Sequence, residues 1–291
     1  MQLYQRRLRG HQRRASDLLT IGPVLEPGRG DLMNQAPFIS RRLSDSELRQ
    51  FAAEGYLVCG ATLSPRGLEQ IREECMASWN REKSAFDPDK TWLENALLPN
   101  IHHRSALVRQ FYFEGPLVDV AEQIIGPNLK AATSQLTFKT RGNRMVFPWH
   151  QDNGYGELEP YNAISCLTAL DDTSLENGCL WVIPGSNRTG QQAHARGKAA
   201  ADAKHGAELM AGADESRAVP VPMKAGESLV MSCWTLHKSG PNRSGRDRRI
   251  LFFRYADADA VEVYNQRRPR LGRLLRGRTR FEAVRRFEAD L

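Results

Sequence analysis

The chain has no long run of apolar residues, and this absence limits what it can be. No stretch of its 291 residues approaches the roughly 18 consecutive apolar residues that a membrane-spanning helix needs. The N-terminus has no apolar segment of the kind found in secretory signals. We therefore expect a globular protein without a membrane anchor, and its 41% of hydrophobic residues is enough to bury a core.

Cysteine is scarce as well. The five cysteines are odd in number, scattered and set among apolar neighbours: Cys59, Cys75, Cys166, Cys179 and Cys233. This pattern is typical of reduced core residues and does not suggest a disulfide framework. It predicts a reducing cytoplasm as the location of the protein.

The two basic ends of the chain lack the interleaved aromatic residues that stack on nucleic-acid bases. Residues 1–32 hold six arginines against three acids, and residues 265–291 hold nine arginines against three acids. Because the net charge of the whole chain is +7, the body between these ends is mildly acidic. We expect solvated or partner-facing tails, and nucleic-acid binding is not favoured.

The charge pattern and the turn residues divide the chain into three parts. Residues 1–32 contain Gly-Pro and Pro-Gly pairs without hydrophobic periodicity, which predicts a poorly ordered basic extension with Met33 as an alternative start. Residues 33–264 are expected to form the folded domain. Residues 265–291 are an Arg-rich tail, and the near-helical spacing of Phe281, Val284 and Phe287 predicts a helix within it.

Helices are expected mainly in the N-terminal half. Ser44 and Glu47 form a capping box for a short helix that Gly55 ends. Ser64-Pro65 begins a second helix, and Gly115-Pro116 begins a third that stops at Gly126. Between the first two, residues 56–59 are predicted to form a strand.

The second half of the chain is dominated by predicted strands. Alternating or continuous apolar segments cover residues 145–149, 161–170, 179–183, 218–223, 228–233 and 249–255, after a first strand region that begins at Leu129. Many short strands preceded by helices predict a mainly β fold with flanking helices, of the jelly-roll or double-stranded β-helix (cupin-like) class. Residues 186–216 are polar and aperiodic, and we expect them to form a functional lid.

The segment FPWHQD carries the strongest chemical signal. His150 and Asp152 are two residues apart, so on an extended chain end both side chains leave the same face. His237 is the candidate third ligand, and two imidazoles with one carboxylate form the facial triad of non-heme Fe(II) oxygenases. The adjacent His102 and His103 lie in a polar segment, where a surface pair is expected more than a ligand pair.

Three segments together resemble the phytanoyl-CoA dioxygenase family of Fe(II)- and 2-oxoglutarate-dependent oxygenases, over about residues 40–256. They are WHQD at 149–152, LTALDDTSLENGCLWVIPGS at 167–186 and HKSGPNRSGRDRR at 237–249. The resemblance implies a jelly-roll fold, O2 as oxidant, and His150, Asp152 and His237 as iron ligands.

The same resemblance assigns the cosubstrate site. Arg248 matches the arginine that binds the distal carboxylate of 2-oxoglutarate, Ser239 matches a hydroxyl that assists it, and Gln135 lies where some members have an amide near the cosubstrate. Leu167 and Lys238 depart from the family pattern, which often has tryptophan and glycine at these positions. Asp152 fills the position that related halogenases leave open for chloride, which implies hydroxylation.

Three functions remain open at this point. The first is a dioxygenase that hydroxylates a small-molecule substrate and releases succinate and CO2 from 2-oxoglutarate. The second is a hydrolase that holds zinc in the same His/Asp/His site, since catalytic zinc also has three protein ligands. The third is a non-catalytic jelly-roll binding protein with Arg-rich interaction tails. The substrates that the residues allow are a small amine, a quaternary ammonium or phosphonate compound, or a natural-product scaffold.

Overall fold

Two antiparallel sheets packed face to face form the centre of the protein. The computed structural model describes residues 36–83, 95–155, 158–192 and 213–291, and Gln35–Leu291 form one compact unit. The larger sheet has the strand order β1-β9-β6-β11-β3-β14, and β2 pairs with part of β3. These strands are β1 (Tyr56–Ala61), β2 (Leu97–Pro99), β3 (Leu129–Lys139), β6 (Ala163–Ala169), β9 (Glu227–Ser232), β11 (Arg248–Asp257) and β14 (Arg273–Arg276).

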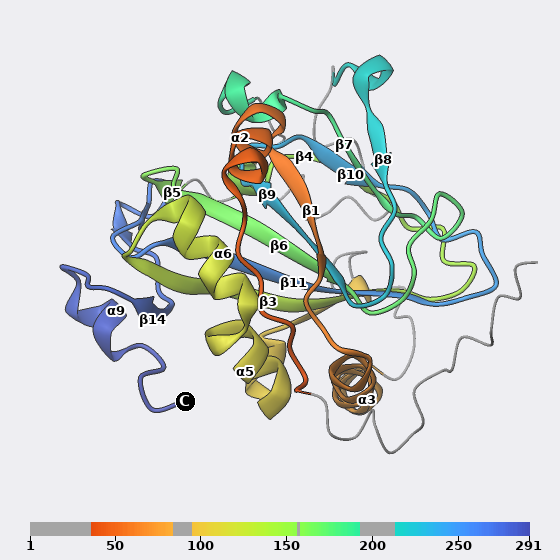
Figure 1. The fold of residues 1–291 in the computed structure, drawn as a ribbon, viewed down its shortest axis with the longest axis horizontal. Helices are drawn as coiled ribbons and strands as arrows, with labels where there is room; N and C mark the ends of the chain where they lie inside the picture. Colours follow the sequence, from red (N-terminus) through yellow and green to blue (C-terminus); the bar gives the residue numbers. More distant parts are fainter. Residues whose placement is uncertain (1–35, 84–94, 156–157, 193–212) are drawn as a thin grey trace, which may run out of the picture. The chain divides into compact units, whose positions relative to one another are not determined.

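The smaller sheet has the order β4-β10-β7-β8 and lies above the larger sheet in Figure 1. Its strands are β4 (Phe147–His150), β7 (Leu180–Val182), β8 (Val219–Val221) and β10 (His237–Ser239). A third group of short strands has the order β13-β12-β5. It consists of β5 (Leu158–Glu159), β12 (Val261–Glu262) and β13 (Arg268–Pro269).

Strand β11 shows how the sheet separates two cores. Leu251 and Phe253 point to one face and pack in the core beneath the helices. Ile250 and Phe252 point to the other face, where they pack with a cluster that includes Leu180 of the smaller sheet. Because alternate residues of a strand face opposite sides, one strand contributes to both cores. The predicted mainly β jelly roll with flanking helices is confirmed.

Helices α3, α5 and α6 cover the outer face of the larger sheet (Figure 1). Trp79 of α3 packs edge-on against Phe138 of β3, with ring centroids 4.8 Å apart. The helices are α2 (Asp45–Glu54), α3 (Pro65–Glu82), α5 (Ala106–Glu114), α6 (Pro116–Ile125), α7 (Asp152–Tyr155) and α9 (Glu282–Arg286). Short 3-10 turns are η1 (Ile101–His103), η2 (Ser186–Thr189) and η3 (Glu215–Arg217).

The predicted helix ends are confirmed by their hydrogen bonds. The Ser44 hydroxyl accepts from the Glu47 backbone N–H, and the Glu47 side chain accepts from the Ser44 N–H. Gly55 ends α2 with a φ of 83°, which glycine adopts without a steric cost. Helix α5 was not predicted. Its residues are largely apolar and follow the N-cap Ser105, but the sequence before it is mixed and polar and shows no helical pattern.

Two of the sequence-based predictions fall outside the described residues. They are the poorly ordered extension at 1–32 and the central part of the proposed lid, residues 193–212. The described part of the lid segment includes η2 and η3, which flank this range. Among the described helices, none is both long and apolar enough to cross a membrane.

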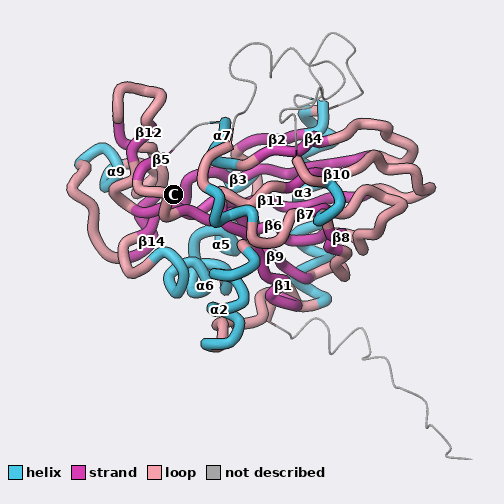
Figure 2. Tube along the Cα trace, turned by 90° about the horizontal axis from the view of Figure 1, so that it is seen from above, coloured by secondary structure: helices cyan, strands magenta, loops and turns pink. Residues whose placement is uncertain are grey.

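The C-terminal residues differ from the expected tail. Strand β14 pairs with β3, with Leu274 opposite Lys130, and Val284 of α9 is fully buried. Figure 2 shows β14 and α9 at the same end of the body as β5 and β12. The boundary predicted at residue 264 therefore cuts through a sheet. The arginine-rich sequence offered no indication of this packing. A half-buried edge strand pairs through its backbone and needs few apolar side chains.

We predict that removing residues 265–291 destabilises the domain. The deletion exposes the edge of β3 and removes Val284, whose burial alone is worth about 1.5–3 kcal/mol. A loss of this size lowers the midpoint of thermal unfolding by about 3–12 °C in a domain of this length. Calorimetry of chains 33–264 and 33–291 measures the difference, and equal midpoints would contradict the packing described here.

Candidate metal centre

Two paired strands of the smaller sheet bring the candidate histidines together. His150 at the end of β4 is directly opposite His237 of β10 in the antiparallel register. Directly opposed residues have neighbouring side chains on one face of a sheet. The two imidazole ring centroids are 4.0 Å apart. The fold thus closes the 87-residue separation between these histidines through one strand pairing.

Asp152 completes the group from the first position of α7. Its Oδ1 atom lies 3.7 Å from Nε2 of His150 and 3.7 Å from Nε2 of His237. The three ligand atoms all lie within 4.8 Å of one another. The prediction that these residues are close in space is met.

Backbone carbonyls set the orientation of both imidazoles. Nδ1 of His150 lies 2.7 Å from the Pro148 carbonyl oxygen, and Nδ1 of His237 lies 2.9 Å from the Thr235 carbonyl oxygen. A carbonyl only accepts hydrogen bonds, so each Nδ1 carries the proton and each Nε2 presents its lone pair toward Asp152. Metal-binding histidines are oriented in this way. The donor set therefore fits a divalent transition-metal ion.

Asp152 is held in its charged form. Burial alone would raise the pKa of this carboxyl, but His237, Arg254 and His150 lower it, the two imidazoles through the charge they carry when protonated, and so does a hydrogen bond from the Ser165 hydroxyl to Oδ2. The net effect is a pKa below the ordinary value. A carboxylate that stays ionised while buried suits a metal ligand.

A cavity of about 80 Å³ adjoins the three ligands. All six site residues predicted from the sequence line it, together with Leu167 and Lys238, the two departures from the family pattern. Lys238 turns its ammonium group outward, to a carboxylate oxygen of Glu215 at 2.7 Å. The six are His150, Asp152, His237, Arg248, Ser239 and Gln135.

Arg248 lies at the start of β11, only 2% exposed. One guanidinium nitrogen, Nη2, donates to the Gly178 carbonyl oxygen at 2.8 Å, and Nε has no hydrogen-bond partner. Burial lowers the pKa of Arg248 to about 10, so the side chain remains charged near neutral pH. An ionised group with an unused donor in this cavity suits an anionic ligand.

Lys139 is a buried amine that was not predicted from the sequence, and burial together with the charge of Arg248 holds its pKa well below the usual range. It stands opposite Arg248 in the pairing of β3 with β11, and its side chain is fully buried. Its Nζ atom donates to the Ser239 hydroxyl at 2.7 Å and to the Ser239 and Gly240 carbonyl oxygens. Ser239 is thereby fixed as an acceptor, and its own O–H is left to donate. The signal was the polar alternation of Gln135, Thr137 and Lys139 along β3.

Comparisons with known proteins agree with this site. The family model for phytanoyl-CoA dioxygenase matches residues 51–250. Methylphosphonate hydroxylase from Gimesia maris is 30% identical over 236 residues, covering 76% of this chain and 85% of that protein.

Two solved structures share the fold. One, a non-heme monooxygenase described as ThoJ apo, has a TM-score of 0.65 and 23% identity, covering 80% of this chain and 84% of that one. The other, the non-heme alpha-ketoglutarate-dependent carbocyclase SnoK from nogalamycin biosynthesis, has a TM-score of 0.62 and 21% identity, covering 81% and 94%.

The resemblance inferred from the sequence is confirmed by the family match, which includes both halves of the His/Asp/His group and Arg248. The family match supports iron and 2-oxoglutarate as the cofactor and cosubstrate. The chain therefore belongs to the phytanoyl-CoA dioxygenase family and is an Fe(II)- and 2-oxoglutarate-dependent dioxygenase.

Proposed function

We propose that His150, Asp152 and His237 hold Fe(II) and that Arg248 binds the distal carboxylate of 2-oxoglutarate. The observation that carries this assignment is a single cavity that has three converging metal-ligand atoms and a buried arginine with an unused N–H donor. With iron bound there, O2 would be the oxidant and 2-oxoglutarate the electron donor: one oxygen atom would enter the substrate C–H bond as a hydroxyl and the other would enter succinate, which forms together with CO2.

Charge balance supports these roles. Two neutral imidazoles and one carboxylate leave a divalent ion with a net charge of +1, which suits the chelating 2-oxo acid end of the cosubstrate. The distal carboxylate then needs a partner in a buried setting, and the planar guanidinium of Arg248 offers one. We assign the Ser239 hydroxyl a second hydrogen bond to that carboxylate, with Lys139 holding the hydroxyl in place. Gln135 is assigned to contact the cosubstrate near the metal.

The hydrolase alternative requires a general base beside the metal. Among the described residues that line the cavity, Asp152 is the only carboxylate, and it is one of the three converging ligands. Asp152 also occupies the coordination position that chloride would need in a halogenase. Both observations favour hydroxylation by this site.

We also propose that the substrate is a small anion, such as a phosphonate. Arg254 of β11 is paired in register with Ser165, whose hydroxyl donates to Asp152. Its guanidinium is buried beside the Cys233 thiol and the Asp152 carboxyl, and its Nε and Nη2 atoms have no oxygen acceptor within hydrogen-bond distance. Arg254 and Arg248 share one face of β11, six residues apart; Arg248 lines the cavity, and Arg254 is a second buried cation close enough to Asp152 to lower the pKa of that carboxyl. The 30% identical relative is a methylphosphonate hydroxylase, which supports this choice.

The location proposed for this reaction is a reducing compartment such as the cytoplasm. All five cysteines are free and buried in the described structure. Burial raises the pKa of Cys59 and Cys75 to about 12, so their thiols stay protonated. Such thiols act as core side chains.

We predict that Arg248→Ala weakens 2-oxoglutarate binding by a few hundred-fold to several thousand-fold. This loss corresponds to roughly 3–5 kcal/mol for leaving the buried distal carboxylate unpaired. Arg248→Lys should recover only part of the loss, because one ammonium cannot form two parallel hydrogen bonds. Anaerobic titration of the iron-loaded protein with 2-oxoglutarate measures both effects, and iron affinity should barely change.

The matched control is Arg246→Ala, because Arg246 is exposed and two residues away on the same chain segment. It should bind 2-oxoglutarate as the unmodified protein does. A large loss at Arg246 with none at Arg248 would refute the assignment.

For the substrate, we predict that small phosphonates stimulate succinate release and that Arg254→Gln raises their KM by at least about 30-fold. The affinity for 2-oxoglutarate, compared at equal iron content because Arg254 also lowers the pKa of Asp152, should stay within a few-fold. A metabolite panel containing phosphonates, carboxylates and quaternary ammonium compounds, with exposed Arg243→Gln as control, provides the test. Stimulation by quaternary ammonium compounds alone would overturn the anionic substrate.

A further inference from the structure

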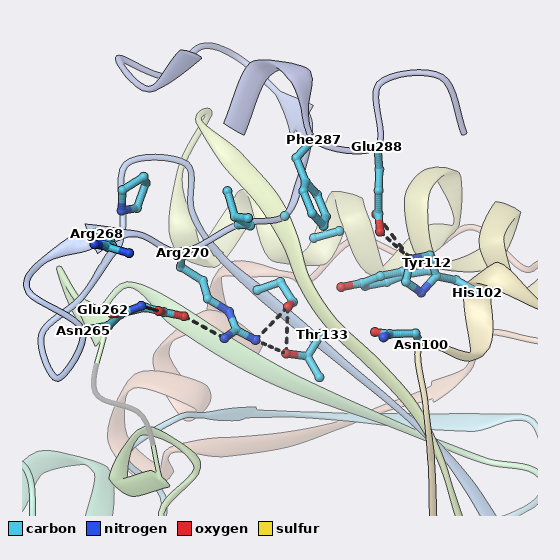
Figure 3. Close-up of a pocket in the computed structure, with 15 residues that line it drawn as sticks. Asn100, His102, Tyr112, Thr133, Glu262, Asn265, Arg268, Arg270, Phe287 and Glu288 are labelled. Carbon is cyan, nitrogen blue, oxygen red and sulfur yellow. Dashed lines mark hydrogen bonds and ion pairs between the residues drawn. The ribbon is translucent and has the colours of Figure 1, made fainter. Parts of the chain in front are cut away.

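A cavity of about 520 Å³ lies at the edge of the larger sheet and shares no lining residue with the cavity of the metal centre. It opens beside β3, where pairing with β14 begins at Ala131 and pairing with β2 ends at Gln135. Figure 3 shows His102 and Glu288 on one side of this cavity and Arg270 with Glu262 on the other. The function assigned above uses neither group.

His102, His103 and Glu288 present three ligand atoms to one point. Nε2 of His103 lies 2.7 Å from Oε1 of Glu288, and Nε2 of His102 lies 3.3 Å from each carboxylate oxygen. One ligand atom from each residue lies within 4.8 Å of the others. The two imidazole centroids are 4.1 Å apart. The pair that the sequence assigned to a surface loop is thus joined by an acid 185 residues further along the chain.

Ser134 on β3 orients the buried imidazole. Nδ1 of His102 is 2.6 Å from the Ser134 hydroxyl oxygen, which also accepts from the His102 backbone N–H at 3.4 Å. When that oxygen accepts from Nδ1–H, the Nε2 atom of His102 presents a lone pair toward the Glu288 carboxylate. Two electron-rich groups facing each other at 3.3 Å favour a cation between them.

The backbone on both sides of the cluster adopts a costly conformation. Asn100, two residues before His102, has a φ of 53°, and Glu288 has a φ of 51°. Residues other than glycine occupy this left-handed region at a cost, and such residues concentrate at ligand sites. Two of the four non-glycine positive-φ residues in the described structure therefore flank or belong to this cluster.

We propose that His102, His103 and Glu288 form a second metal site, for a zinc-class divalent ion. Two ligands of a tetrahedral zinc stand about 3.4 Å apart, so the separation of 3.3 Å already fits and the separation of 2.7 Å must widen by about 0.7 Å, which the half-exposed His103 side chain can provide by rotation. The nitrogen and oxygen donors suit zinc and its neighbours in the first transition row. The adjoining cavity leaves room for a water or a small ligand on the ion. An ion bound there would link Glu288 of the C-terminal segment to His102 and His103 of η1.

Zinc stoichiometry tests the site directly. The full chain is stripped with a chelator, loaded with excess Zn²⁺, desalted and analysed for metal. We expect two zinc ions per chain, one of them in the His/Asp/His site. His103→Ala and Glu288→Gln should each bind one, as should His237→Ala through loss of the other site. His103 has a side chain that is 43% exposed, so its replacement leaves the core intact.

Two further variants separate metal binding from plain hydrogen bonding. Ser134→Ala should weaken zinc at this site by about 10–100-fold, as removal of a partner behind a ligating histidine does. Glu282→Gln, an exposed acid in α9, is the matched control and should retain two ions. One zinc ion per unmodified chain, or two in His103→Ala and Glu288→Gln, would overturn the proposal. In that case the carboxylate only accepts hydrogen bonds from the two imidazoles.

Discussion

The pairing of β4 with β10 is the interaction on which the candidate metal centre depends. It places His237 opposite His150 at the rim of the smaller sheet, and Ser239 lies opposite Phe147 after a one-residue irregularity in the register between these two pairs. A shift of the register by one residue would turn these side chains to the other face. The hydrophobic residues that fill the space between the two sheets, such as Ile250 and Leu180, hold that register. The two candidate ligand histidines are therefore positioned by core packing and not only by their own contacts.

The burial of basic side chains beside the metal centre is the second constraint on the site. Arg248 and Lys139 are both buried at neighbouring positions of two paired strands, and in the described residues neither has a carboxylate partner within salt-bridge distance. Nearby Arg249 contrasts with them, since its guanidinium forms two hydrogen bonds to Asp171. Burying a charge without a partner is costly. Burial and the charge of Arg248 lower the pKa of Lys139 well below its usual range, so Arg248 is the buried cation that remains beside the candidate metal centre, and it suits an anionic ligand.

Much of the catalytic site could be predicted from the sequence because its residues lie in short motifs. The spacing of His150 and Asp152 and the segment from His237 to Arg249 were sufficient to indicate the family. The jelly roll followed from the number and length of apolar segments. These features are local, and their meaning does not depend on distant residues.

The features that were not predicted depend on long-range pairing. Lys139 is an ordinary strand residue until β11 places Arg248 opposite it. The pairing of β14 with β3 is made by backbone groups, so the arginine-rich segment shows no apolar pattern. His102 and His103 form a cluster only because the C-terminal segment brings Glu288 to them. Loop closure across such distances is set by the whole fold and is invisible in local patterns.

The central claim is that the His/Asp/His group binds iron for 2-oxoglutarate oxidation. The most direct test is succinate formation after oxygen is admitted to anaerobically loaded protein, compared between Fe(II) and Zn(II) loading and between the unmodified chain and Asp152→Ala. We expect succinate with Fe(II) alone, and loss of it in Asp152→Ala. Equal succinate in Asp152→Ala, or turnover that needs zinc and leaves 2-oxoglutarate unchanged, would contradict this claim.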